Sequence, residues 1–316
     1  MPSIGIDFTT TKLISGAKLR ASVPSSQNLF LDPDFIILLN NHMVSIVVPM
    51  IKSVNEEYFV VNTDTPLVAG TSEYTIPTRA LGGALRDIVL VDAAGNESDL
   101  PRLQPEIAKQ IGSINNTGVR GIYLRNDKVV FFPSMNSVTA GTSLRFKYER
   151  RPNDLCLTSN AGRIITVTPG ANQIVVASIP ATWTTGTTLD IISPTPQFQS
   201  IQDDAVITNI TGTTITLSAL PTGIAVGQYV AESLTTPIPQ LPYEAHKLIE
   251  QLGAISLLEA MGDDAGKTSA QQTFKSMAES FILIITPRIE GSPQKVISRN
   301  SIFDASARRS GFSTRA

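Results

Sequence analysis

Hydrophobic positions divide the chain into two helical ends and a strand-rich middle. Between residues 241 and 258, apolar side chains recur at spacings of three and four, the period of an amphipathic helix. A second stripe of this period follows between residues 274 and 285, after a Gly-Asp-Asp turn. Exposure of an apolar stripe to water is unfavourable, so we expect the two stripes to pack against each other. The two patterns therefore predict a helical hairpin. Its stripe residues are Ala245, Leu248, Ile249, Leu252, Ile255, Ser256, Leu258, Phe274, Met277, Ala278, Phe281, Ile282 and Ile285.

The N-terminal end also predicts helices. Residues 9–11 can cap a helix that runs to Arg20, and Asp32 followed by Pro33 is typical of the start of a longer helix. Pro49 is expected to kink or interrupt this second helix before residue 57. We expect residues 9–57 to pack on residues 242–286.

Strand signals fill the middle of the chain. Apolar and polar residues alternate with a period of two from about residue 65 to 153, and again in the Thr-rich stretch 163–231. The predicted fold class is therefore α+β, a helical bundle formed from N- and C-terminal helices and interrupted by an antiparallel β domain with an inserted β module. The predicted boundaries are 1–62 for the N-terminal helices, 63–158 for the β domain, 159–236 for the inserted module, 237–287 for the C-terminal hairpin and 288–316 for an extended tail.

Composition favours a protein that assembles with neighbours. Charged residues make up 16% of the 316 residues, against about 25% in ordinary soluble domains. A net charge of -2 gives no general basis for wrapping nucleic acid. The N-terminus lacks a secretory signal pattern, and the apolar run 35–51 is interrupted by polar residues. We therefore expect a soluble protein used without export and without a membrane.

Reactive residues are few. A single cysteine, Cys156, excludes an intrachain disulfide and a cysteine metal cluster, and only two histidines accompany it. We interpret Cys156 as a small core residue and His246 as a packing or helix-end residue. The sequence shows no catalytic constellation, so we expect no enzymatic activity, no cofactor and no metal.

Two motifs invite a chemical interpretation but have a plainer structural one. The stretch 262–268, Gly-Asp-Asp-Ala-Gly-Lys-Thr, is similar to a phosphate-binding loop, yet it is one residue short between its glycines and joins two helices. We interpret it as a connector, with Gly262 ending one helix and Thr268 or Ser269 capping the next. The carboxylate pairs at 203–204 and 263–264 are interpreted as solvated turns, since adjacent side chains point in different directions.

Several segments resemble one known family. Tyr148 to Leu155 resembles the close of the β region in head-to-tail connector (adaptor) proteins of tailed bacteriophages, and Gly70 to Pro77 with Arg86 to Leu90 resembles its opening. The C-terminal hairpin and Ile284 to Gly291 are similar to the C-terminal part of that group. The Thr-rich stretch 163–231 departs from the compact form as an insertion.

The resemblance implies a structural virion protein at the head-tail neck, assembled in the host cytoplasm. Connectors of this group form a ring, typically of twelve subunits, below the portal protein. The ring extends the DNA channel, through which DNA passes without sequence recognition, and provides the platform for a tail or nozzle protein. The low charge of the chain agrees with broad subunit interfaces.

Two other functions remain open at this point. One is a tail or receptor-binding protein whose Thr-rich module recognises carbohydrate, for which the module offers Trp183, Phe198 and Tyr229 as aromatic faces. The other is a peptidoglycan or polysaccharide hydrolase, which needs two carboxylates at a defined separation.

The tail from residue 287 to 316 is predicted to be the main portal-binding element. Six basic residues less two acidic ones give it a local charge of +4. Isolated apolar anchors lie among small and polar residues, a pattern that binds a partner better than it folds alone. A solvated tail and a DNA-facing role for its arginines are the alternatives. The predicted portal-binding residues are Arg288, Arg299, Ile302, Phe303, Arg308, Arg309 and Phe312.

Overall fold

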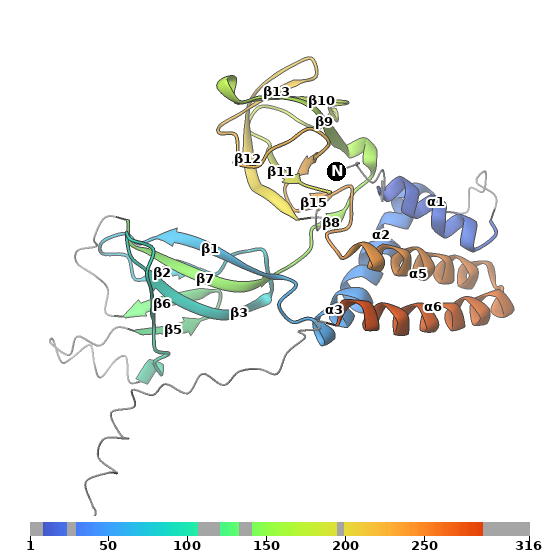
Figure 1. The fold of residues 1–316 in the computed structure, drawn as a ribbon, viewed down its shortest axis with the longest axis horizontal. Coiled ribbons are helices and arrows are strands. Elements are labelled where there is room, and N and C mark those ends of the chain that lie inside the picture. The colour runs from blue at the N-terminus through green and yellow to red at the C-terminus, as the bar shows by residue number, and fades with distance from the viewer. Residues whose placement is uncertain (1–8, 24–29, 107–120, 133–140, 195–198, 287–316) are drawn as a thin grey trace, which may run out of the picture. The chain divides into compact units, whose positions relative to one another are not determined.

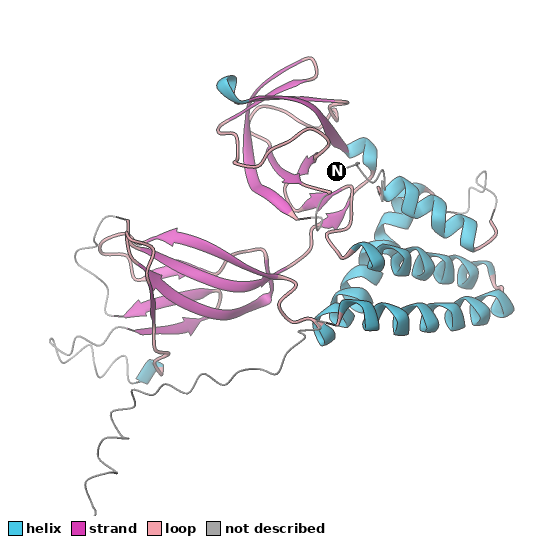
Figure 2. Ribbon diagram, in the orientation of Figure 1, coloured by secondary structure: helices cyan, strands magenta, loops and turns pink. Residues whose placement is uncertain are grey.

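The computed structural model describes residues 9–23, 30–106, 121–132, 141–194 and 199–286 (Figure 1). All of them belong to one unit, Met1–Thr286. Strands dominate this part of the chain (Figure 2). Its helices come from the two ends of the sequence. They are α1 (Thr10–Arg20), α2 (Asp32–His42), a π-helical turn η1 (Met43–Val47), α3 (Val48–Val54), α5 (Tyr243–Met261) and α6 (Asp264–Ile285).

The first β region consists of two antiparallel sheets that share one apolar core. One sheet has the order β1-β7-β3-β4 and the other β2-β6-β5. Buried Phe131 from one sheet and Leu144 and Phe146 from the other belong to this core. The strands are β1 (Val60–Pro66), β2 (Glu73–Thr75), β3 (Ala80–Val91), β4 (Glu97–Asp99), β5 (Gly121–Arg125), β6 (Lys128–Phe132) and β7 (Ser143–Arg150).

The Thr-rich stretch forms a closed six-stranded barrel in the order β10-β13-β12-β11-β14-β9. Apolar side chains such as Ile174, Leu189 and Ile215 fill its interior, so the barrel is packed rather than hollow. The strands are β9 (Ala161–Thr168), β10 (Gln173–Val176), β11 (Thr188–Ile192), β12 (Ser200–Thr211), β13 (Thr214–Leu217) and β14 (Tyr229–Glu232), with short 3₁₀ turns η2 (Thr158–Asn160) and η3 (Pro169–Ala171). A short parallel pair, β8 (Asp154–Leu155) and β15 (Thr235–Thr236), flanks the barrel in the sequence.

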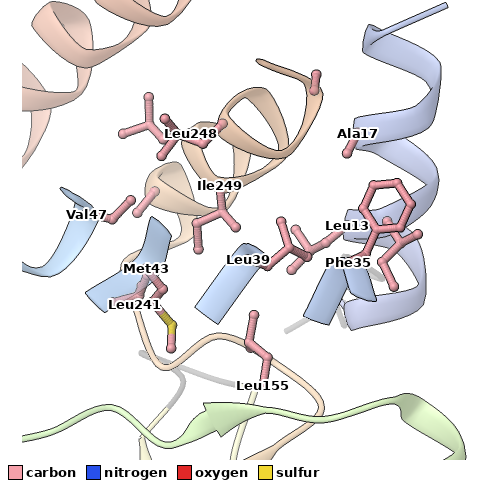
Figure 3. Packing of buried hydrophobic residues seen from close by; sticks show 14 of the residues in the cluster. Leu13, Ala17, Phe35, Leu39, Met43, Val47, Leu155, Leu241, Leu248 and Ile249 are labelled. Carbon is pink, nitrogen blue, oxygen red and sulfur yellow. The ribbon is translucent and has the colours of Figure 1, made fainter. Parts of the chain in front are cut away.

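Helices from both ends of the chain share one hydrophobic core. Figure 3 shows Leu13, Leu39 and Ile249 from three different helices meeting in it. Gly253 of α5 permits this close packing, because a Cβ atom there would lie 3.0 Å from Leu39 Cδ2 and 3.1 Å from Ala17 Cβ. Such distances are shorter than ordinary contacts between carbon atoms, so the helices approach where the side chain is absent.

The long N-terminal helix passes through Pro49 by widening instead of breaking. Proline lacks an N–H, and its ring crowds the carbonyl four residues earlier. That carbonyl belongs to Ser45, which lies in the π-helical turn Met43–Val47. The helix continues to Val54, so the predicted interruption at Pro49 does not occur. By length and composition alone Asp32–Val54 could cross a membrane, a test that core helices also pass, and one face of it lies in the shared core.

The predicted fold class is wrong. The described part of the chain is a mixed α/β structure made mostly of strands in several sheets, including a closed barrel, and not a helical bundle with an inserted β module. The error has a physical cause, because period-two patterns identify strands one at a time. Barrel closure depends on pairs such as Tyr229 with Arg163, which are distant in the sequence.

A buried polar joint as the candidate functional site

A buried arginine connects the first β region to the barrel. Arg79 lies directly before β3, and its guanidinium contacts residues of β11 and β12. Arg79 Nη1 and Nη2 donate to the two carboxylate oxygens of Asp190 at 2.7 and 2.9 Å. Nη2 also lies 2.8 Å from Asp204 Oδ1. We call this arrangement the Arg79 joint, comprising Arg79, Arg150, Asn153, Asp190, Asp203, Asp204 and Ser233.

A β-bulge brings the carboxylates together. In the β11–β12 ladder Leu189 pairs with Ala205 and Ile191 pairs with Gln202, so residues 203 and 204 both lie opposite Asp190. Asp204 takes a left-handed backbone conformation with φ 55°, which the bulge requires. Adjacent carboxylates that would otherwise diverge are thereby both directed to Arg79.

Asp190 has a full set of hydrogen-bond donors. Besides Arg79, it accepts from Asn153 Nδ2 at 2.6 Å and from the backbone N–H groups of Asp204 and Leu234, each at 3.0 Å. The side chain is completely buried. A buried carboxylate is tolerated only when it is paired and hydrogen-bonded in this way. The joint therefore fixes structure and leaves Asp190 no free oxygen for acid-base chemistry.

A second arginine completes the joint. Arg150, the last residue of β7, donates from Nη1 and Nη2 to both oxygens of Asp203 at 2.6 and 2.7 Å. Burial opposes ionisation of Asp203, but the hydrogen bonds and charge of Arg150 outweigh it and hold the pKa of Asp203 below its ordinary 3.8. The interpretation of residues 203–204 as a turn is wrong, because both lie within β12 and their carboxylates form ion pairs. The solvated part of that interpretation holds for Asp204, whose side chain is 56% exposed.

The 262–268 loop is a connector, as the sequence predicts. Gly262 ends α5 with φ 73°, and α6 begins two residues later. The predicted cap is wrong, however, because Asp263 Oδ1 accepts from Gly266 N at 2.9 Å, while Thr268 and Ser269 lie inside α6. With Asp264 in the first turn of α6, the second carboxylate pair serves the helix start.

His246 is a packing residue in this structure, whereas Cys156 is half-buried and belongs to none of the hydrophobic clusters. His246 is fully buried on α5, and its Nε2 lies 3.1 Å from the carbonyl oxygen of Pro239. Burial raises the pKa of the Cys156 thiol to about 11, so the thiol stays protonated and unreactive at neutral pH.

We expect the free energy of unfolding to decrease as pH falls from about 6.5 toward 4. Burial lowers the pKa of His246 from 6.5 to about 4. Below pH 6.5 the His246 imidazole of the unfolded chain binds a proton, whereas the buried imidazole of the folded chain stays neutral down to about pH 4. The free energy of unfolding therefore decreases by up to roughly 3 kcal/mol. Urea denaturation of the parent and of His246→Gln at neutral and mildly acidic pH measures this dependence. The variant should show the smaller loss, and equal losses would contradict the assignment.

The aromatic residues proposed for carbohydrate do not offer faces to solvent where they are described. Trp183 and Tyr229 are each 4% exposed, and Phe198 lies outside the described residues. The predicted portal-binding residues also lie outside the described residues, since all belong to 287–316. The structure therefore does not test whether these residues lie close together.

Sequence reasoning missed the Arg79 joint. The available signal was an arginine followed by two apolar strand residues, Ala80 and Leu81, but it does not reveal a partner 111 positions away. Across the described ranges, no group of three or more His, Cys, Asp or Glu side chains could hold a metal ion. Comparison of the chain with protein-family models and with curated proteins finds no match.

Proposed function

We propose that this chain is a structural virion protein, a head-to-tail adaptor. In this proposal, twelve subunits form a ring below the portal, extend the DNA channel and provide the attachment platform for a tail or nozzle protein. DNA passes through the channel without sequence recognition, and no membrane or cofactor takes part. The protein assembles in the host cytoplasm and resides at the head-tail neck of the virion. The segments that resemble phage connectors support this function.

The observation that carries the proposal is aliphatic exposure on the helices. Of the thirteen large hydrophobic side chains exposed in the described chain, seven belong to helices or their caps. Single exposed apolar residues are ordinary on a monomer, so these side chains support the proposal as candidate subunit contacts on several helices. These seven are Leu19, Leu31, Ile37, Val44, Met261, Leu283 and Ile284.

The competing functions find less support. A carbohydrate site needs exposed aromatic faces, and the described aromatic residues of the barrel named for this role are buried. A hydrolase needs an available carboxylate pair, whereas Asp190, Asp203 and Asp204 are all bound by arginine. The adaptor function needs neither feature.

Light scattering coupled to size exclusion tests the oligomeric state, with the chain alone and with portal protein. We expect an assembly whose mass is a multiple of the 33.9 kDa chain, near twelve copies, in at least one of the two conditions. A monomer in both conditions would overturn the proposal.

Ile37→Asp should prevent assembly while leaving the subunit folded. The Ile37 side chain is 61% exposed on α2, so the free energy of unfolding of the subunit should change by about 0.5 kcal/mol or less. A charge placed in an apolar subunit contact is costly, because it becomes buried without a partner. Light scattering and thermal melting measure the two effects. Gln272→Asp, on the polar face of α6, is the matched control. Parent-like assembly of Ile37→Asp would exclude this face of α2 from the interface.

Truncation after Arg288 should abolish portal attachment without unfolding the protein. All apolar anchors and most of the positive charge of the 287–316 segment follow that residue. Pull-down with portal protein measures attachment, and circular dichroism measures the fold. The full-length chain carrying Ser298→Ala is the control. Undiminished portal binding by the truncated chain would contradict a role for this segment.

A further inference from the structure

A cavity of about 350 Å³ is lined by the first β region, the barrel and the segment that precedes α5. This volume lies within the range of about 300–1,000 Å³ that is typical of ligand pockets. Its wall combines apolar side chains with a few polar groups, as ligand pockets usually do. The lining residues are 58–62, Arg150, Pro152, Gln199, Ser200 and Gln240.

Gln240 lines the cavity with a buried amide group. The residue is 8% exposed, and its Oε1 accepts from the backbone N–H of Asn153 at 2.8 Å. Because a backbone N–H only donates, the atom that it contacts is the amide oxygen. The NH2 group of Gln240 is left without an acceptor in the described part of the chain. Buried donors in folded proteins nearly always have an acceptor, so this NH2 group indicates that one enters the cavity.

Arg150 supplies a second unpaired donor to the same cavity. Both of its Nη atoms donate to the carboxylate of Asp203, at 2.6 and 2.7 Å. Its Nε is buried and has no hydrogen-bond partner among the described residues. A guanidinium only donates, so this N–H group, like the NH2 group of Gln240, requires an acceptor from a ligand.

Charges beside the cavity favour a neutral ligand over an anion. Arg150 belongs to the Arg79 joint, in which two arginines face three aspartates, so two positive charges less three negative ones leave -1. A carboxylate or phosphate brought to this place would meet a net negative charge and lose affinity. The acceptor that suits both donors is therefore an uncharged oxygen, such as an amide carbonyl.

The edge of β1 adds main-chain groups to the wall. β1 is the outer strand in the order β1-β7-β3-β4, and the described residues pair with it along one side only. Arg150 N donates to the Phe59 carbonyl at 2.7 Å, and hydrogen bonding alternates along an antiparallel ladder. The N–H and C=O groups of Asn62, which lines the cavity, therefore point away from β7. A main-chain donor and acceptor on an open edge match the N–H and C=O groups of an extended peptide.

We propose that the cavity binds a short extended peptide segment of a partner protein through its backbone amides. Two carbonyl oxygens of the segment accept from Gln240 Nε2 and Arg150 Nε, and one further residue pairs with the N–H and C=O groups of Asn62. Apolar side chains of the segment contact Val60 and Pro152. The peptide thereby adds at the beginning of β1 and fills the cavity beside it. This inference does not depend on the adaptor function.

Binding of a capped amino acid tests the proposal with the full-length protein. The probe is N-acetylvaline N-methylamide, which carries two peptide groups and one apolar side chain. Saturation-transfer NMR should show saturable binding with a Kd of about 1–10 mM, the range for so small a ligand. Acetate is the comparison compound, and we expect it to bind at least about tenfold more weakly because it is an anion.

Two variants assign the binding to this cavity. Gln240→Glu keeps the oxygen that accepts from Asn153 N and replaces the donor by a second oxygen, so the Kd should rise about tenfold. Gln271→Glu, at an exposed position on α6, is its control. Asn62→Trp places a bulky side chain at an exposed strand position beside the cavity and should also raise the Kd about tenfold. Thr166→Trp, exposed on β9, is its control.

Three results would overturn the proposal. Absence of saturable binding by the parent would show that water alone occupies the cavity. Equal binding of acetate would show that the site selects an anion. Parent-like binding by both variants, each shown to be folded by thermal melting, would place the probe elsewhere on the protein. Asn62→Trp alone decides this point where Gln240→Glu unfolds.

Discussion

Arg79→Met should destabilise the protein by roughly 3–5 kcal/mol, because it leaves the buried carboxylate of Asp190 without its counter-charge. Asp190 is 0% exposed, and both of its oxygens bind the guanidinium. Chemical denaturation at neutral pH, followed by circular dichroism, measures the loss.

Arg145→Met is the matched control for this prediction. Arg145 also pairs with two carboxylates, Asp64 and Glu97, but on the solvent-exposed side of the sheet. Water screens such pairs, so this substitution should have a much smaller effect. The double variant Arg79→Met, Asp190→Asn should recover part of the lost stability, because it removes both buried charges. Equal effects of the two single variants would show that the joint is not a buried ion pair in solution.

Leu252→Asp should cost several kcal/mol, because it places an unpaired charge in the core that the two chain ends share. Leu252 is 4% exposed, and Phe281→Asp should act in the same way on α6. Thermal melting measures both variants.

Ser276→Asp provides the control on the same helix as Phe281, since Ser276 is exposed and is not among the candidate subunit contacts. Its melting temperature should stay close to that of the parent. If Leu252→Asp and Phe281→Asp also melted like the parent, the shared core would be wrong.

The sequence predicts the parts of the fold that depend on local periodicity. The stripe on residues 241–258 is buried as expected, with Leu248, Ile249 and Leu252 in the shared core. The stripe position Ser256 has a polar role instead, since its hydroxyl lies 2.7 Å from His42 Nε2. A spacing of three and four identifies a face, but it does not distinguish an apolar contact from a hydrogen bond between helices.

Features that depend on distant pairs were not predictable from local patterns. Asp203 and Asp204 appear as a polar turn in the sequence, and only the bulge opposite Asp190 makes them partners of Arg79. Barrel closure likewise depends on strand pairs that are distant in the sequence, such as Tyr229 with Arg163. The candidate portal-binding residues were chosen by charge and isolated apolar anchors, and that choice stays a prediction because the segment lies outside the described residues.

The Arg79 joint has a consequence for exchanging the barrel between proteins. Replacing residues 163–231 by a short linker would remove Asp190, Asp203 and Asp204 and leave Arg79 and Arg150 facing no counter-charge. A barrel transplanted into another host would likewise carry three carboxylates that need arginines there. Grafting should therefore succeed only when arginines and aspartates are moved together, which makes this barrel a poor choice for a freely interchangeable part.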